Sequence, residues 1–503
     1  MAFVASLSLG AAQNFPLHVG GAWRDGSGGR RDVLSPATGK VIETVADATA
    51  EDVDRACRGA AEALPGWAAT DGAERARLLR RLADIIASRI QELAALESRI
   101  TGRPIREMRA QMTRIPEWLE YFAGIVLGLE GEANRVKGGF LTYTQYRPYG
   151  VCALLTPWNH PVLILVKKLA AALAAGNTVV IKPSELAPVS PLIIAEWAVE
   201  AGIPAGVVNV VTGAAEAGAA LVANPHVARI DLTGGTGTGR RVAAAAADRL
   251  VPCTLELGGK TPVLVFEDAE QGEAVAGALF SAFVAAGQTC VSGARFLVQR
   301  SVYDRFLDEF ARRVGQLRLG DPADMATDVG PVISGASRDR CMSFIEEART
   351  DGAPLVAGGK LPTLADELSG GFFVPPTVFA DVSPGMRLFR DEVFGPVVGV
   401  TPFADEHEAV SLANDSPFAL GASIWTRDVL RGHRVAGQLR AGVTWINDHH
   451  KNDPRSIWGG FAASGYGKEN GWDALKSYMT KGSVVVRTQE RFDDWFAGGQ
   501  RYG

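Results

Sequence analysis

The sequence predicts an α/β protein with a mainly parallel sheet, followed by a second α/β series. From residue 150 onward, apolar strand-like stretches alternate with helical stretches, which is typical of right-handed βαβ units. A second series of the same kind begins near residue 262. Two further segments, FLTYTQYRPYG (140–150) and KGSVVVRTQ (481–489), alternate polar and apolar residues and predict exposed strands. An uncovered pair of such strands would be a natural contact between subunits.

A helical region is predicted before the first series of alternating strands and helices. Apolar residues recur at helical spacing between residues 51 and 100, which predicts amphipathic helices. The strands of the first series are expected at 151–157, 178–184, 207–213, 229–234 and 253–259, with helices at 162–176, 190–202, 216–224 and 238–250. In such sheets, ligands bind beyond the carboxyl ends of the strands.

The second α/β series contributes further strands and a helix. Its strands are predicted at 262–266, 295–299, 375–382, 396–403, 422–426 and 442–447, and a helix at 303–317. A chain of 503 residues exceeds what one hydrophobic core organises, so several structural units are expected.

Composition excludes several classes of protein. The net charge is −5 and no long basic run occurs, so a nucleic-acid partner is not expected. Apolar stretches are too short to span a membrane, and the first 21 residues, which lack a basic start, are interpreted as a loose arm. The five cysteines are widely spaced, which suits free thiols in the cytoplasm and no zinc site. No metal is expected, although the adjacent His449 and His450 are noted.

Four motifs lie at predicted strand ends or turns and offer complementary chemical groups. They are TPWNHP (156–161), IKPSE (181–185), LELGGK (255–260) and GQTC (287–290). They supply an amide, a cation with a carboxylate, a second carboxylate and a thiol.

Together with EVFGPV (392–397), WINDHH (445–450) and GYGKENG (465–471), these motifs resemble the aldehyde dehydrogenase superfamily, over nearly the whole chain. The resemblance implies a Rossmann-like parallel-sheet cofactor domain, an α/β catalytic domain and a small β element for oligomerisation. The domains would comprise 1–129 with 150–259 (cofactor), 260–465 (catalytic), 130–149 with 477–490 (bridging) and 491–503 (tail). A homodimer or homotetramer is expected.

The resemblance assigns catalytic roles that the side-chain chemistry supports. Cys290 would be the nucleophile, because a thiolate attacks an aldehyde carbonyl, and a nearby helix N-terminus is expected to lower its pKa. Asn159 would donate to the oxyanion, and Glu256 would activate water. Lys168 and Glu469 match positions proposed to relay protons, with a structural ion pair as the alternative.

The resemblance also implies a nicotinamide cofactor, NAD, with NADP as an open alternative. Glu185 favours NAD because its carboxylate would repel a 2′-phosphate. Gly235 is a departure, since many relatives have serine there. The expected cofactor residues are Thr156, Trp158, Lys182, Ser184, Glu185, Gly213, Thr233, Gly234, Gly235, Leu257, Glu392 and Phe394.

The helix after Asn159 gives the best indication of substrate. His160, Ile164 and Lys167 share one helical face, which in relatives lines the substrate tunnel. A polar, cationic wall predicts a carboxylated semialdehyde or a phenolic aldehyde, unless these charges face solvent. The expected substrate residues are His160, Ile164, Lys167, Thr289, Val291, Lys451 and Trp458, with His449, His450 and Arg455 in the same loop.

Other functions remain open at this level. A betaine-aldehyde-like or broad-range dehydrogenase, an acylating dehydrogenase, a cysteine-dependent esterase and a non-catalytic relative are the alternatives. Glu256 argues against acyl transfer to coenzyme A, because acylating relatives usually lack it. The presence of Cys290, Asn159 and Glu256 together argues against a non-catalytic protein.

Overall fold

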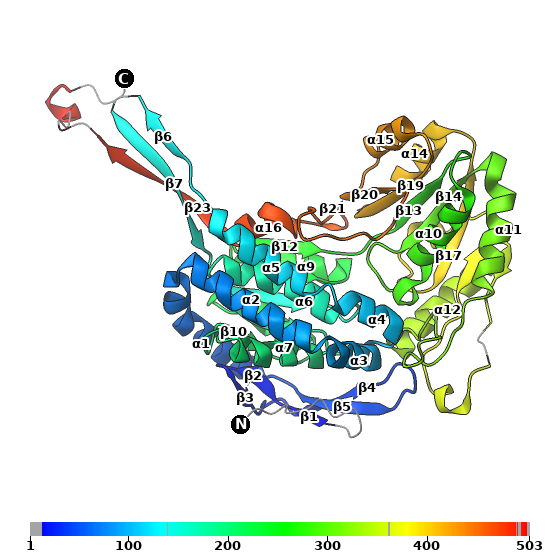
Figure 1. Cartoon of the computed structure of the whole chain (residues 1–503), viewed down its shortest axis with the longest axis horizontal. Coiled ribbons are helices and arrows are strands. Elements are labelled where there is room, and N and C mark those ends of the chain that lie inside the picture. Colours follow the sequence, from blue (N-terminus) through cyan, green and yellow to red (C-terminus); the bar gives the residue numbers. More distant parts are fainter. Residues whose placement is uncertain (1–12, 138, 361–362, 489, 491–493, 500–503) are drawn as a thin grey trace.

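The protein consists of two lobes and a projecting arm (Figure 1). A computed structural model describes residues 13–137, 139–360, 363–488, 490 and 494–499. Over these residues, no helix is both long enough and apolar enough to cross a membrane.

The first lobe is built on an eight-stranded sheet in the order β22-β12-β11-β8-β9-β10-β2-β3. Its strands are β2 (Leu17–Val19), β3 (Ala22–Arg24), β8 (Val151–Thr156), β9 (Thr178–Pro183), β10 (Val208–Val210), β11 (Val227–Thr233), β12 (Cys253–Glu256) and β22 (Gly465–Tyr466). The run from β12 to β10 is parallel, as the strand–helix alternation predicts. The strands at both ends of this run pair antiparallel.

Helices cover both faces of this sheet. They are α1 (Ala50–Ala69), α2 (Gly72–Ser88), α3 (Ile90–Thr101), α4 (Ile105–Met112), α5 (Pro116–Ile125), α6 (Pro161–Ala174), α7 (Val189–Glu200), α8 (Ala215–Ala223), α9 (Thr236–Asp248) and α16 (Gly471–Ser477). Alternate residues of β8 therefore pack into different apolar clusters. Cys152 and Leu154 lie in one cluster, and Val151, Ala153 and Leu155 lie in the other. The predicted helices and strands of this series are confirmed.

The prediction of a loose N-terminal arm is wrong for its described part. Leu17–Val19 (β2) is buried and pairs with β10 and β3 of the large sheet. Gln13–Phe15 (β1) pairs with β5 (Val41–Ala46), which pairs with β4 (Arg30–Leu34) in a separate small sheet. β1 and β2 were missed because each has three residues and contributes little local pattern. Residues 1–12 of the predicted arm lie outside the described residues.

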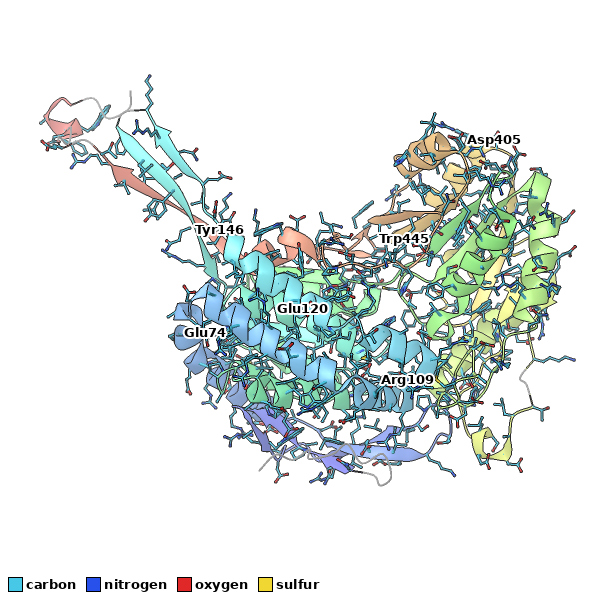
Figure 2. The ribbon with its side chains drawn as sticks, viewed as in Figure 1. Glu74, Arg109, Glu120, Tyr146, Asp405 and Trp445 are labelled. Atoms are coloured by element: carbon cyan, nitrogen blue, oxygen red, sulfur yellow. The ribbon has the colours of Figure 1, made fainter. Side chains whose placement is uncertain are left out.

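The second lobe is built on a seven-stranded sheet in the order β15-β16-β17-β14-β13-β19-β20. Its elements are β13 (Thr261–Val265), α10 (Gln271–Phe283), β14 (Gly293–Gln299), α11 (Tyr303–Val314), α12 (Gly335–Thr350), β15 (Leu355–Ala357), β16 (Thr377–Phe379), α13 (Arg387–Arg390), β17 (Val397–Phe403), α14 (Glu406–Asn414), β19 (Gly421–Trp425), α15 (Val429–Ala436) and β20 (Val443–Ile446). The sheet is parallel except where β15 joins β16. Trp445 of β20 lies on the side of this lobe that faces the first lobe (Figure 2).

The arm consists of the two segments that alternate in polarity. β7 (Phe140–Pro148) pairs antiparallel with β23 (Met479–Arg487) along its whole length, and β6 (Ala133–Val136) pairs with the other edge of β7. In Figure 1 the arm extends away from both lobes, and Tyr146 in Figure 2 lies near its base. The alternation therefore indicates a strand pair with no core to cover it.

Short elements complete the chain. They are β18 (Phe418–Ala419), paired with β21 (Phe461–Ala462), and the 3₁₀ turns η1 (Val126–Gly128), η2 (Val284–Gly287), η3 (Arg300–Val302), η4 (Asp366–Leu368) and η5 (Trp495–Ala497). Residue 489 of the predicted strand, and residues 491–493 and 500–503 of the predicted tail, lie outside the described residues.

The edge strand β22 depends on a glycine. Gly465 pairs with Glu256, has φ of +105°, and a Cβ there would lie 1.9 Å from the Leu255 carbonyl oxygen. We expect Gly465→Ala to lower stability by about 2–4 kcal/mol, because both the backbone conformation and the strand pairing would be lost. Thermal unfolding measures this.

Gly59→Ala is the matched control. Gly59 lies inside α1, and a Cβ there would meet nothing within 4 Å. This substitution should leave stability equal or raise it by up to about 1 kcal/mol. Equal melting temperatures for the two variants would contradict the role of β22.

Candidate active site

Glu256 lies at the carboxyl end of β12, where parallel sheets place ligand-binding groups. Its side chain is buried, and neither carboxylate oxygen has a hydrogen-bond partner among the described residues. Burial, followed by the nearby charge of Glu469, raises the pKa of Glu256 to about 8. A carboxyl group of this kind can exchange a proton near neutral pH.

Cys290 lies in the turn between η2 and β14. The three residues Ala285, Ala286 and Gly287 just before it have positive φ angles of 53°, 53° and 71°. L-residues rarely adopt this conformation, so the surrounding contacts must hold the turn in place. The Gln288 amide supplies two of them, donating to the Ala285 carbonyl (3.1 Å) and accepting from the Ile333 N–H (2.9 Å).

The prediction of a lowered pKa for Cys290 is wrong. Burial, followed by the charge of Glu256, raises the pKa of the Cys290 thiol to about 12. Burial in this turn thus outweighs the expected stabilisation of the thiolate. The thiol is therefore protonated until a base removes its proton.

Asn159 lies just before α6, and its side-chain amide donates to the Gln288 carbonyl at 2.8 Å. That bond uses one of two amide hydrogens. The backbone N–H of Cys290 makes no hydrogen bond within the described part of the chain. These two N–H groups can therefore donate to an oxygen beside the Cys290 sulfur.

Two cavities, lined from both lobes, meet at Thr233, Glu256 and Cys290. The first, of about 200 Å³, is lined by Pro157, Trp158, Asn159, Thr233, Gly234, Gly235, Glu256, Leu257, Gly258, Cys290, Glu392 and Phe394. The second, of about 40 Å³, is lined by His160, Leu163, Ile164, Lys167, Thr233, Glu256, Thr289, Cys290, His450, Asn452, Trp458 and Glu469. Cys290 and Glu256 are thus reachable from two sides.

Most of the predicted cofactor residues line the first cavity. The exceptions are Thr156, Lys182, Ser184, Glu185 and Gly213, which lie at or beyond the carboxyl ends of β8, β9 and β10. Lys182 pairs with Glu185 at 3.6 Å. The Glu392 carboxylate accepts from the Gly259 N–H at 2.9 Å, and burial raises the pKa of Glu392 to about 7.

The predicted substrate residues that line the second cavity are His160, Ile164, Lys167, Thr289 and Trp458. Lys167 is buried there, so the alternative that its charge faces solvent is wrong.

Two predicted substrate residues, Val291 and Lys451, do not line this cavity. Val291 lies in the turn before β14 and packs behind the cavity in a buried apolar cluster with Leu420, Trp445 and Trp458. Lys451 is exposed and contributes only its carbonyl, which accepts from Trp445 Nε1 at 2.9 Å.

Two other residues of the predicted loop, Arg455 and His449, also do not line the second cavity. Arg455 pairs with Asp453 at the surface. His449 is buried in the wall, where its ring contacts Ser423 Oγ (3.2 Å) and the Val291 carbonyl (2.8 Å). Within the described residues, no group of His, Cys, Asp and Glu side chains is arranged to hold a metal ion.

A buried cluster of charges lies against the second cavity. Glu469 contacts Lys167 and Lys168, each at 2.6 Å, and Lys168 also pairs with Asp231. Burial alone would raise the pKa of Glu469, but the two lysines lower it to about 2. Burial opposes the charge of Lys168, yet Asp231 and Glu469 raise its pKa. The geometry is that of a charged ion pair, which was the alternative to a proton relay.

Sequence reasoning missed several residues around the second cavity. Leu163 and Asn452 line it, while Arg103 and Gln111 hold His160 from behind. Arg103 and Gln111 lie in a helical region far from any motif, so no local signal indicates them.

Comparison with known proteins gives a consistent result. A model described as "Aldehyde dehydrogenase family" matches residues 23–484. A betaine aldehyde dehydrogenase of Brucella melitensis biotype 2 is 42% identical over 470 residues, covering 93% of this chain and 96% of the relative.

Solved structures agree. PnpE from Pseudomonas sp. WBC-3 superposes with a TM-score of 0.94 at 42% identity, covering 96% of this chain and 100% of that one. Betaine aldehyde dehydrogenase from Staphylococcus aureus, in complex with NAD+, gives 0.93 at 36% identity, covering 96% of each chain. Fold, motifs and relatives together show that the chain belongs to the aldehyde dehydrogenase family.

Proposed function

We propose that this protein oxidises an aldehyde to the carboxylic acid with NAD, through a thioester on Cys290. The observation that carries the proposal is that Cys290 and Glu256 lie in the wall shared by the two cavities. One cavity can then hold cofactor and the other substrate, with the reacting sulfur between them.

The residues divide the chemistry between them. Glu256 in its carboxylate form takes the proton of the Cys290 thiol, whose pKa near 12 prevents ionisation by itself. The sulfur attacks the aldehyde carbon, and Asn159 with the Cys290 N–H donates to the resulting oxyanion. NAD+, when bound, supplies the hydride acceptor. After Glu256 has released the thiol proton to solvent, its carboxylate takes a proton from water. The resulting hydroxide attacks the thioester and releases the acid, with the Cys290 thiolate as leaving group.

The first cavity and its surroundings fit a dinucleotide. Gly235 is the N-cap of α9, no side chain caps this helix, and a Cβ at Gly235 would meet nothing within 4 Å. Its N–H groups can therefore receive a pyrophosphate. Glu392 and Phe394 would hold the nicotinamide ribose, and Lys182 with Glu185 the adenosine ribose. The structures of relatives in complex with NAD+ or nicotinamide adenine dinucleotide support NAD here, and NADP stays open.

A polar aldehyde fits the second cavity best. A quaternary ammonium group would need an uncovered aromatic face. Lys167 Nζ lies 4.8 Å from the centre of the Trp458 ring and occupies one face of it. A carboxylated semialdehyde or a phenolic aldehyde therefore fits better than betaine aldehyde, although betaine aldehyde dehydrogenases among the relatives keep it as the second candidate.

The assembly and the domain roles are also proposals. Val485 and Val486 of β23 are 61% and 41% exposed, which suits burial against another subunit in a homodimer or homotetramer. We assign 1–129 with 150–259 to the cofactor, 260–465 to catalysis and 130–149 with 477–490 to subunit contact.

Cys290→Ala should abolish aldehyde-dependent NADH formation and leave NAD binding intact, because only the nucleophile is lost. Absorbance of NADH and calorimetric titration of NAD measure the two properties. Cys253→Ala, at another partly exposed cysteine, should keep turnover. Turnover by Cys290→Ala near the parent rate would rule out the mechanism.

The rate of turnover should rise with pH through about 8, because Glu256 has its pKa there and acts only as a carboxylate. Glu256→Gln should lower kcat by about 100- to 10,000-fold and remove that rise. NADH formation between about pH 6 and 10 measures both effects. An unchanged pH profile in Glu256→Gln would contradict its role as base, and the exposed Glu51→Gln is the control.

Lys167→Met should improve the kcat/KM for betaine aldehyde by about 3- to 30-fold, because the cation that lies over the Trp458 ring is replaced by an uncharged side chain of similar length. Lys451→Met, outside the cavity, should change nothing. Equal effects of the two substitutions would refute the explanation of substrate preference.

A further inference from the structure

One edge of the His160 ring is held from outside the second cavity. Arg103 Nη1 lies 2.8 Å from His160 Nδ1, and Gln111 Nε2 lies 2.9 Å from the same atom. Arg103 is buried, and its guanidinium also donates to the Glu107 carboxylate at 2.8 Å. His160 itself is 5% exposed and lines the cavity.

These contacts determine which ring nitrogen carries the proton. A guanidinium has only donors, so Nδ1 of His160 must be the acceptor. Burial and then the charge of Arg103 lower the pKa of His160 well below its usual value, which keeps the ring neutral. A neutral imidazole with an unprotonated Nδ1 carries its hydrogen on Nε2.

The Nε2–H group of His160 is left for the cavity. Among the described residues, Nε2 of His160 makes no hydrogen bond. It is also not one of the polar side-chain atoms that are fully buried without a partner, so it is accessible. It lies on the ring edge opposite Nδ1, so it does not face Arg103 or Gln111. The cavity therefore has a fixed hydrogen-bond donor on its wall.

A second imidazole lies beside the first. The His450 ring centre is 6.1 Å from that of His160, and His450 also lines the cavity. Burial and then His449 lower the pKa of His450 to about 3, so it too is neutral. Lys167 is already paired with Glu469, so this part of the wall offers hydrogen bonds and not an unpaired cation.

We propose that His160, through its Nε2–H and beside His450, selects aldehydes whose far end carries an acceptor oxygen. Arg103 and Gln111 are the positioning residues that fix this donor. The inference rests on the proposed function and narrows its substrate class to aldehydes with a carboxylate, carbonyl or hydroxyl oxygen. An alkyl end offers no acceptor, and a trimethylammonium end would place a cation against an N–H donor.

The test compares matched aldehydes on the intact protein. Succinic semialdehyde is paired with 4-methylpentanal, and 4-hydroxybenzaldehyde with 4-methylbenzaldehyde, so that alkyl groups of similar shape replace the distal oxygens. The quantity measured is the ratio of kcat/KM within each pair. The first pair reports a carboxylate acceptor and the second a hydroxyl acceptor.

His160→Leu should lower this ratio by about tenfold in at least one pair, because the donor is lost. His160→Gln, which keeps an N–H donor at a similar reach, should restore most of it. Gln111→Met should raise KM for the preferred acceptor aldehyde more than it raises KM for its alkyl partner. His433→Leu, at an exposed histidine of α15, is the control and should leave every ratio at the parent value.

The outcomes separate this inference from the proposed function. If the parent protein oxidises none of the four aldehydes and no other member of an aldehyde panel, the proposed function fails. If it oxidises both members of a pair and His160→Leu keeps both ratios, the inference alone is overturned. Equal loss in His160→Gln and His160→Leu overturns it as well, because the ring would then act by shape and not as a donor.

Discussion

The active site depends on the contacts made by the segment of chain that returns from the second lobe to the first. Glu469 enters the first lobe and lies between Lys167 and Lys168 of α6, with Asp231 on the far side of Lys168. Two buried cations and two buried carboxylates balance one another there. Removing one partner of a buried pair typically costs about 3–5 kcal/mol, because the other charge is left without compensation. This cluster therefore ties α6, β11 and the C-terminal return into one unit.

The same return completes both the sheet and the cavity. β22 adds to the edge of β12 beside Glu256, and the backbones of Trp458 and Glu469 bond to each other at 2.8 Å in both directions. These two bonds hold Trp458 in the wall of the second cavity. One crossing segment therefore fixes the position of the catalytic groups of the first lobe relative to the thiol of the second lobe.

Much of this architecture could be predicted from the sequence, and the reasons for the rest are physical. β8 and β9 were predictable because parallel strands buried on both faces have largely continuous apolar sequences. β2 was missed, since a strand of three residues carries almost no pattern. The motifs indicated Cys290, Glu256 and Asn159, but not the raised pKa of the thiol, which arises from burial and from a carboxylate distant in sequence. Likewise, the charge on Lys167 was visible in the sequence, but its neutralisation by Glu469 was not.

The left-handed turn before Cys290 has a consequence for how this chain can change over evolution. Two alanines there adopt a conformation that costs each L-residue roughly 1–2 kcal/mol, and glycine would remove that cost. Glycine would also widen the range of backbone angles open to the segment that holds the sulfur. Substitution of either alanine by glycine would therefore relieve backbone strain and at the same time loosen the segment that holds the thiol. The placement of one atom thus limits which residues positions 285 and 286 can accept.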